Sequence, residues 1–450
     1  MPVDASLGER REITAAPAVI GQGRAWYAVG LLGVLYIVAF VDRAILGLLV
    51  EPIKADLGVS DNQISLLIGL TFALFYSLVG LPLGRLADRV SRRDIIFFTA
   101  LLWGTATFSS GLATTFAFLC LMRIGVAVGE AALTPSVTSL ISDMFPRERR
   151  ARAMGVYVAM GNLGAKLAYV IGGLVLAVIG ARLFIDLPFL GQVKPWQLVF
   201  MVVAAPALLI AIVIRLTLPE PPRPVTEAAI AAGKKPFAWV KREWRPLVLF
   251  FIGGGFGQTI AVGMSAWTPS YLLREFGWPI AEAGIYLGAV STVGGVSGVL
   301  IFTNLAEWLT KKGHISALPN ILLIGLLCGS ALMVGAALAP TPWLFLTLYA
   351  LGLFGLSGTG VMSMVAVQWT APTTLRGELM SVYLLLNSLL SMGLGPSAIT
   401  LVSGLFGGPA HLGAGFAVVA LVCGPIGAGF VLASRKGLMG LHRAAIASGS

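Results

Sequence analysis

The feature that most constrains this chain is a series of apolar runs, each about as long as a helix that crosses a bilayer. A spanning helix needs about 20 mostly apolar residues. Of the 450 residues, 57% are hydrophobic and only 11% are charged, whereas charged residues make up roughly a quarter of an ordinary soluble domain. The sequence therefore predicts an integral membrane protein.

The apolar runs fall into two sets of six. The predicted spans are residues 25–50, 64–84, 95–113, 115–141, 154–179 and 196–216, and then 246–272, 283–305, 317–338, 343–367, 379–405 and 415–433. Residues 218–245 separate the sets with closely spaced prolines and then basic residues, which predicts a linker. We expect a tail (1–24), a six-helix bundle (25–217), the linker (218–245), a second bundle (246–433) and a tail (434–450).

Basic residues in the connections predict the orientation, because Lys and Arg are retained on the cytoplasmic side of a membrane. One set of alternate connections, which includes the linker, holds seventeen Lys and Arg residues. The other set holds four, namely Lys54, Arg182, Lys194 and Arg274. We therefore expect both termini and the linker in the cytoplasm. The polar first 23 residues do not resemble a cleaved signal peptide, so we expect the first span to be retained. The sequence has no Asn-x-Ser/Thr glycosylation site and its outer loops are short, so a bacterial inner membrane is the expected location.

An internal repeat relates the two sets. Residues 86–89 read LADR and residues 305–308 read LAEW, each followed by a basic pair, at an offset of 219. A second match aligns Pro146, Arg150, Met154, Val156 and Tyr157 with Pro372, Arg376, Met380, Val382 and Tyr383, at an offset of 226. The two matches predict duplicated halves. The expected fold is an all-α membrane protein with 12 transmembrane helices in two pseudo-symmetric six-helix bundles.

Other classes of protein find little support. The net charge of +11 lies in short clusters between apolar runs, so it favours membrane orientation over a nucleic-acid partner. The sequence has no filter motif of a channel, and its three histidines fall in predicted loops or ends, away from any nucleophile or metal cluster. We expect no enzyme activity and no cofactor.

Residues 84–93 read GRLADRVSRR. This segment resembles the signature that follows the second helix of major facilitator transporters, with Ser91 in place of a glycine. The resemblance implies a cytoplasmic gate, in which an Asp caps a neighbouring helix and pairs with Arg to hold the two halves together. The alternative is a basic loop that only sets topology. The gate would comprise Gly84, Asp88, Arg89, Arg92, Arg93, Arg150, Glu307 and Arg376.

Two further motifs resemble the spinster-type lipid transporters of that superfamily. Asp42 and Arg43 match an Asp-Arg pair late in the first helix, and residues 123–131, RIGVAVGEA, match a fourth-helix motif except for Ala127. The resemblance implies a small amphipathic substrate, such as a lysophospholipid or a sphingosine phosphate, carried across the bilayer by a monomer that uses the proton gradient. A proton-linked carrier of sugars or small organic anions is the alternative.

Five charges fall within predicted spans, where each costs a few kcal/mol unless it is paired or hydrated. At about 1.5 Å per residue, Asp42 and Arg123 lie at the same depth, about 12 Å from the outer surface. Glu130 and Lys166 each lie about 20 Å from the cytoplasmic side. We therefore expect Asp42 to pair with Arg123, and Glu130 with Lys166.

These charges suit proton coupling. Burial favours the neutral form of a carboxyl group, and a nearby cation favours the charged form. Asp42 and Glu130 are therefore the expected proton carriers, with Arg43, Arg123 and Lys166 as counter-ions or as contacts for a substrate headgroup. The alternative is a structural cluster of ion pairs.

Lys166 departs from the spinster resemblance, because small residues surround it. It is a coupling residue, a contact for a substrate phosphate, or a substitution that holds one conformation. The second half offers only uncharged polar groups, chiefly Gln258, Gln368 and Asn387. These line a substrate path or form hydrogen bonds between helices.

Overall fold

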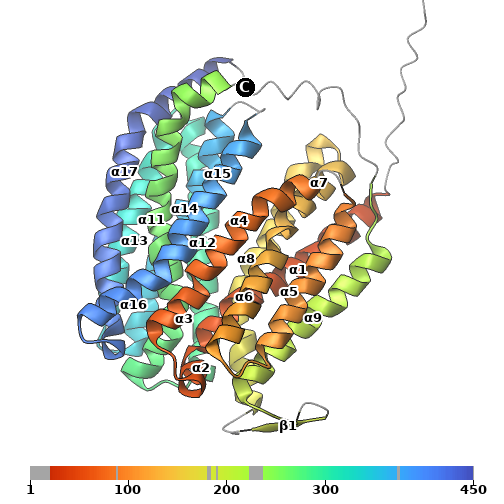
Figure 1. The fold of residues 1–450 in the computed structure, drawn as a ribbon. Coiled ribbons are helices and arrows are strands. Elements are labelled where there is room, and N and C mark those ends of the chain that lie inside the picture. Colours follow the sequence, from red (N-terminus) through yellow and green to blue (C-terminus); the bar gives the residue numbers. More distant parts are fainter. Residues whose placement is uncertain are drawn as a thin grey trace, which may run out of the picture.

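The structure is a computed structural model that describes residues 21–87, 90–179, 184–188, 191–221, 237–371 and 375–448. Helices form nearly all of it (Figure 1). The first half consists of α1 (Gln22–Leu48), α2 (Val50–Leu57), α3 (Asp61–Ile68), α4 (Leu70–Ala87), α5 (Arg92–Ser110), α6 (Phe116–Ala131), α7 (Leu133–Met144), α8 (Arg147–Ile179), a hairpin of β1 (Ile185–Leu187) and β2 (Gly191–Val193), and α9 (Pro195–Thr217). The second half consists of α11 (Phe237–Phe276), α12 (Ile280–Lys311), α13 (Ala317–Ala337), α14 (Pro342–Thr370), α15 (Arg376–Ser388), the π-helix η1 (Leu389–Leu394), α16 (Gly395–Leu405), the 3-10 helix η2 (Pro409–His411) and α17 (Leu412–Ser448).

Eleven of the twelve predicted spans coincide with described helices that are long and apolar enough to cross a membrane. The remaining span is α5, which starts with Arg92, Arg93 and Asp94 and is therefore less apolar. It packs against α6 and α9 within the first half. The predicted all-α fold with two helical bundles is thus confirmed.

Three spans are interrupted helices. The second span breaks at Gly69 between α3 and α4, and the fourth breaks at Ala132 between α6 and α7. The eleventh passes from α15 through η1 into α16. Such breaks are tolerated inside a membrane where neighbouring helices satisfy the freed backbone groups, and π-helical turns are frequent at functional sites.

The two bundles have two distinct ends. The hairpin end carries α2, η2 and the β1–β2 hairpin, and the linker end carries the starts of α5 and α8 together with residues 218–221. The helices of the two halves lie close together at the hairpin end and diverge toward the linker end (Figure 1). α11 begins at Phe237, within the predicted linker, and α17 continues to Ser448, within the predicted tail.

Glycines allow the two halves to approach closely near the hairpin end. A Cβ on Gly69 would lie 2.4 Å from the carbonyl oxygen of Met392 in η1. A Cβ on Gly173 of α8 would lie 2.7 Å from the carbonyl oxygen of Ala281 in α12. Real Cβ atoms do not come this close to a carbonyl oxygen, so these contacts between the halves require glycine.

Candidate functional site

An ion pair buried in the interior of the first half joins Asp42 of α1 to Arg123 of α6. Nη1 of Arg123 donates to Oδ1 of Asp42 at 3.1 Å, and the Thr107 hydroxyl on α5 donates to Oδ2 at 2.6 Å. The Asp42 side chain is 1% exposed and that of Arg123 is 3% exposed. The pairing of Asp42 with Arg123 predicted from depth is confirmed, and Thr107 supplies a further donor.

The second pair joins Arg43 to Glu130. Nε of Arg43 donates to Oε2 of Glu130, whose side chain is fully buried. The guanidinium also lies 5.0 to 5.1 Å from the ring centres of Phe40, Phe72 and Tyr76. Aromatic faces stabilise a cation that has left water, so Arg43 is held by α1, α4 and α6 together. We call Asp42, Arg43, Arg123 and Glu130 the four-charge cluster.

The predicted pairing of Glu130 with Lys166 is wrong. Glu130 binds Arg43, and the ammonium of Lys166 lies instead 3.5 Å from the position of a Cβ on Gly295 of α12. The rise per residue gave the position of Lys166 along the axis of α8, but not the neighbouring helix toward which its side chain points. Gly164 faces the Ile37 backbone of α1, and a residue two positions further points about 200° around the helix, away from α1.

The length of Arg43 explains how it reaches Glu130. Side chains on a helix lean toward its N-terminus, which for α1 is at the linker end. Glu130 is the last residue but one of α6 and comes seven residues after Arg123 along that helix, on the side away from its hairpin-end start at Phe116. The long side chain of Arg43 leans toward the linker end and thereby reaches Glu130.

Several buried polar atoms of this region have no hydrogen-bond partner. They include Oε1 of Glu130, Nε of Arg123 and the hydroxyl of Tyr157. Tyr157 stacks on Tyr36 with ring centres 4.4 Å apart, and Tyr36 contacts Phe40. Buried polar groups are normally satisfied, so the cluster retains a free carboxylate oxygen that could accept a proton.

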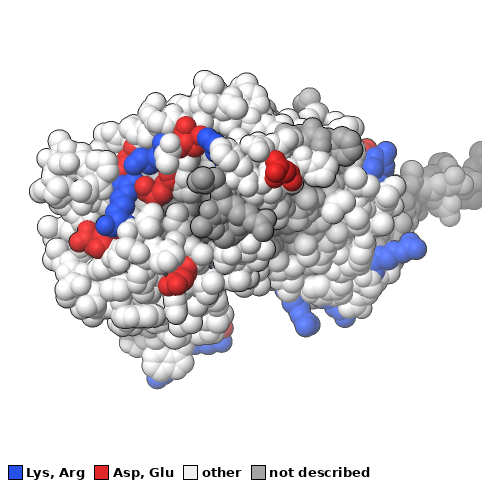
Figure 2. All heavy atoms as spheres, turned by 90° about the horizontal axis from the view of Figure 1, so that it is seen from below, with Lys and Arg blue, Asp and Glu red and all other residues white. Residues whose placement is uncertain are grey.

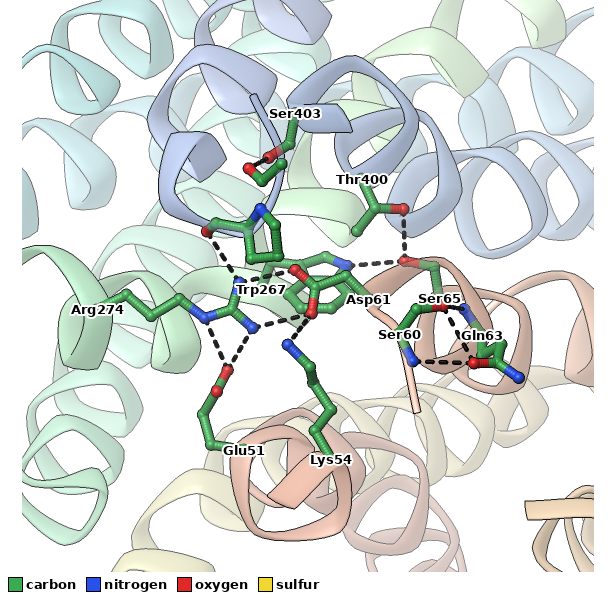
Figure 3. A network of polar contacts seen from close by, with 12 residues as sticks. Glu51, Lys54, Ser60, Asp61, Gln63, Ser65, Trp267, Arg274, Thr400 and Ser403 are labelled. Carbon is green, nitrogen blue, oxygen red and sulfur yellow. Dashed lines mark hydrogen bonds and ion pairs between the residues drawn. The ribbon is translucent and has the colours of Figure 1, made fainter. Parts of the chain in front are cut away.

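A second group of charges joins the two halves at the hairpin end (Figure 3). Arg274 of α11 donates to Oε1 of Glu51 at 2.6 and 2.9 Å, and to the two carboxylate oxygens of Asp61 at 2.7 and 2.9 Å. Lys54 also pairs with Asp61. We call Glu51, Lys54, Asp61 and Arg274 the hairpin-end network. Viewed from this end, basic and acidic side chains gather side by side on a mostly uncharged surface (Figure 2).

Neutral hydrogen bonds extend the contact between the halves beside this network. Nε1 of Trp267 donates to the Ser65 hydroxyl at 3.1 Å, and the Thr400 hydroxyl donates to the same oxygen at 3.0 Å. The Ser65 hydroxyl in turn donates to the Pro396 carbonyl at 3.1 Å. Ser65, on α3, therefore binds both α11 and α16 of the other half.

The predicted gate residues that the structure describes bind within their own half or to Glu220, just after the end of α9. Arg92 pairs with Asp143 and with Glu220, and Nε of Arg150 donates to the Phe145 carbonyl. The Arg93 backbone N–H donates to Glu220, and Glu307 pairs with Lys311. Asp88 and Arg89 lie outside the described residues, as do the surroundings of Gly84 and the side chain of Arg376.

The polar residues predicted in the second half differ in their exposure and in their hydrogen bonds. Gln258 donates to the Leu356 carbonyl and to the Thr359 hydroxyl, so it forms hydrogen bonds between α11 and α14. Gln368 is exposed on α14. Asn387, one residue before the end of α15, has a buried side-chain oxygen, Oδ1, without a hydrogen-bond partner.

Sequence reasoning missed the hairpin-end network. Lys54 and Arg274 were counted only as loop residues that set topology, and Glu51 and Asp61 were not singled out. The available signal was that opposite charges gather in connections otherwise poor in charge, with Arg274 in one half and its acidic partners in the other. Among the described residues, His, Cys, Asp and Glu form no group of three that could hold a metal ion.

Two six-helix bundles, with buried ion pairs inside one of them, define a membrane transporter of the two-bundle class. The chain belongs to the major facilitator superfamily, whose family model matches residues 32–396.

Known relatives and solved structures agree with this assignment. An MFS-type efflux pump of Mycolicibacterium smegmatis is 30% identical over 293 residues, which is 65% of each protein's length. A probable L-galactonate transporter of Escherichia coli is 25% identical over 74% of this chain and 73% of its own length. A bacterial homolog of the human lysosomal transporter Spinster, solved in an inward-facing and unoccupied conformation, superposes with a TM-score of 0.77 at 25% identity, covering 94% of this chain and 98% of its own. The resemblance to spinster-type transporters is thus confirmed.

Proposed function

We propose that the protein is a proton-coupled carrier that works by alternating access and moves an amphipathic, lipid-like substrate. The four-charge cluster carries this proposal, because it places two carboxylates and two guanidinium groups in the interior of one half. Protonation of one carboxylate would leave its arginine without a counter-charge. Such a change in a membrane interior costs several kcal/mol unless the pairing rearranges, which is how proton uptake would bias the conformation.

The arrangement of the halves supports alternating access. If the linker end is cytoplasmic, as the basic residues predict, the hairpin end faces outward and is closed by Arg274 and its partners. The conformation would then be inward-facing. To face outward, the carrier would have to break the bonds between the hairpin-end residues and close the linker end, where Arg92 and Arg93 lie.

Proton coupling is tested by transport in proteoliposomes with and without a pH gradient. The proteins are wild type, Asp42→Asn and Glu130→Gln, with Glu282→Gln as a control at an exposed position of α12. Gradient-driven uptake should be at least tenfold lower in both cluster variants than in wild type, and unchanged in the control. Wild-type dependence on pH in both cluster variants would refute the scheme.

A second candidate substrate is a small organic anion such as a sugar acid. The similarity to a probable L-galactonate transporter favours it, whereas the structural similarity to a Spinster homolog favours a lipid. Uptake of headgroup-labelled lysophosphatidylethanolamine and of radiolabelled galactonate by the same proteoliposomes distinguishes the two.

A further inference from the structure

Lys166 differs from the other cations inside the first half because no carboxylate neutralises it. Arg123 is paired with Asp42, and Arg43 with Glu130. No described Asp or Glu lies within ion-pair distance of the Lys166 ammonium. Of the three residues expected to contact a substrate headgroup, only Lys166 has its charge free for one.

Lys166 lies at the seam between the halves, which we define as the contact of α8 with α12. Its carbonyl oxygen is 3.2 Å from the position of a Cβ on Gly288, and its ammonium is 3.5 Å from that of a Cβ on Gly295. From its carbonyl oxygen to its ammonium, Lys166 thus lies along seven residues of α12, about 10 Å, with the ammonium toward the linker end. Substrate passage between two rocking halves has to use such a seam.

The seam widens along the length of this side chain. A Cβ on Gly288 would lie 2.4 Å from Val170 and 3.3 Å from its backbone nitrogen, so the helices touch there. At Gly295, the atoms that such a Cβ meets within 4 Å, among the described residues of other helices, are Cε and Nζ of Lys166, at 3.4 and 3.5 Å. The half-buried ammonium therefore sits where the tight contact ends and the halves begin to separate.

An ammonium inside a membrane protein is costly unless it is paired or hydrated. A bound anion would offset that cost, and lysine binds phosphate and carboxylate groups as a compact point charge. We propose that Lys166 binds the anionic group of the transported substrate at the seam, while the four-charge cluster handles protons. This inference rests on the proposed transport function and assigns the substrate an anionic group, either a lipid phosphate or a sugar-acid carboxylate.

The test is ligand binding by purified protein in detergent, which needs no pH gradient. Two matched pairs of probes are used, lysophosphatidic acid against a monoacylglycerol of equal chain length, and galactonate against galactitol. Wild type should bind one anion at least tenfold more tightly than its neutral partner, and the preferred pair identifies the substrate class. Lys166→Gln and Lys166→Met should abolish this preference, while Lys166→Arg should keep it.

Lys311→Gln is the control, because Lys311 lies on the same seam helix but is largely exposed at the linker end. The melting temperature of Lys166→Met shows whether a loss of binding reflects misfolding. Removal of an unpaired charge inside the membrane should not lower it. The inference is overturned if Lys166→Met keeps the anion preference, if it weakens the anionic and neutral probes equally, or if wild type prefers neither anion. If Asp42→Asn and Glu130→Gln keep wild-type dependence on pH while Lys166 still sets the anion preference, only the coupling scheme is refuted.

Discussion

The four-charge cluster and the hairpin-end network use the same chemistry with different connectivity. Each combines two carboxylates with two basic groups. The cluster joins α1 to α6 inside one half, so it stays intact when the halves move as rigid bodies. The network joins α11 of the second half to α2 and α3 of the first half. Ion pairs of the same chemistry therefore have different roles. Only the pairs that connect the two halves form or break when the conformation changes.

Burial sharpens this difference. Side chains of the Asp42–Arg123 pair are 1% and 3% exposed, whereas those of Arg274 and Glu51 are 15% and 24% exposed. Removal of one partner of a buried pair leaves an uncompensated charge, and an exposed partner regains water. We therefore expect cluster mutations to act on folding and proton coupling, and network mutations to act on the balance between conformations.

The largest effect is expected for Asp42→Ala, which leaves Arg123 buried without a counter-charge. Such a loss costs about 3–5 kcal/mol of stability. Thermal unfolding in detergent should show a clearly lower midpoint than for Arg274→Ala. Asp42→Asn is the control of similar size, and it should lose less because it still accepts from Thr107. Equal midpoints for the two alanine variants would remove the distinction between cluster and network.

Arg274→Gln should shift the protein away from the conformation with a closed hairpin end. Hydrogen bonds to charged groups contribute about 1.5–3 kcal/mol, which corresponds to a change of tenfold or more in the population ratio. Spin labels at the exposed positions Asn62 and Phe406, one in each half, should report longer distances. Lys194→Gln is the control, since Lys194 pairs with Asp56 within the first half. An unchanged distance distribution would mean that Arg274 does not hold the halves together.

Gly69→Ala should oppose the same closure by steric means. The added Cβ would lie 2.4 Å from the Met392 carbonyl oxygen, and overpacking costs about 1–3 kcal/mol. The same label pair should shift in the same direction, by less than for Arg274→Gln. Gly30→Ala has nothing within 4 Å of its Cβ and should leave the distances unchanged. A wild-type distribution for Gly69→Ala would argue against a tight contact between these two broken helices.

Thr107→Val is expected to have the smallest effect. It removes one hydrogen bond to the Asp42 carboxylate and leaves the ion pair, at a cost of about 1–2 kcal/mol. The melting temperature should fall slightly, and Thr107→Ser should restore it. Thr99→Val is the matched control, because that hydroxyl binds only backbone carbonyls of its own helix. If both valine variants behave alike, Thr107 adds nothing specific to the cluster.

The sequence determined what depends on distance along the chain. Apolar run length gave the spans, and an axial rise of about 1.5 Å per residue placed Asp42 level with Arg123. The duplicated motifs gave two halves. The spans and the pairing of charges at equal depth follow from the bilayer, which requires helices of a set length and penalises unpaired charges.

Only the tertiary structure decided what depends on direction around a helix and on contact between the halves. Lys166 and Glu130 lie at similar predicted depths, yet Lys166 faces α12 and Glu130 meets Arg43. Arg274 finds Glu51 across 223 positions of sequence. Rotational direction depends on which helices pack together, and a sequence pattern does not encode that packing one residue at a time.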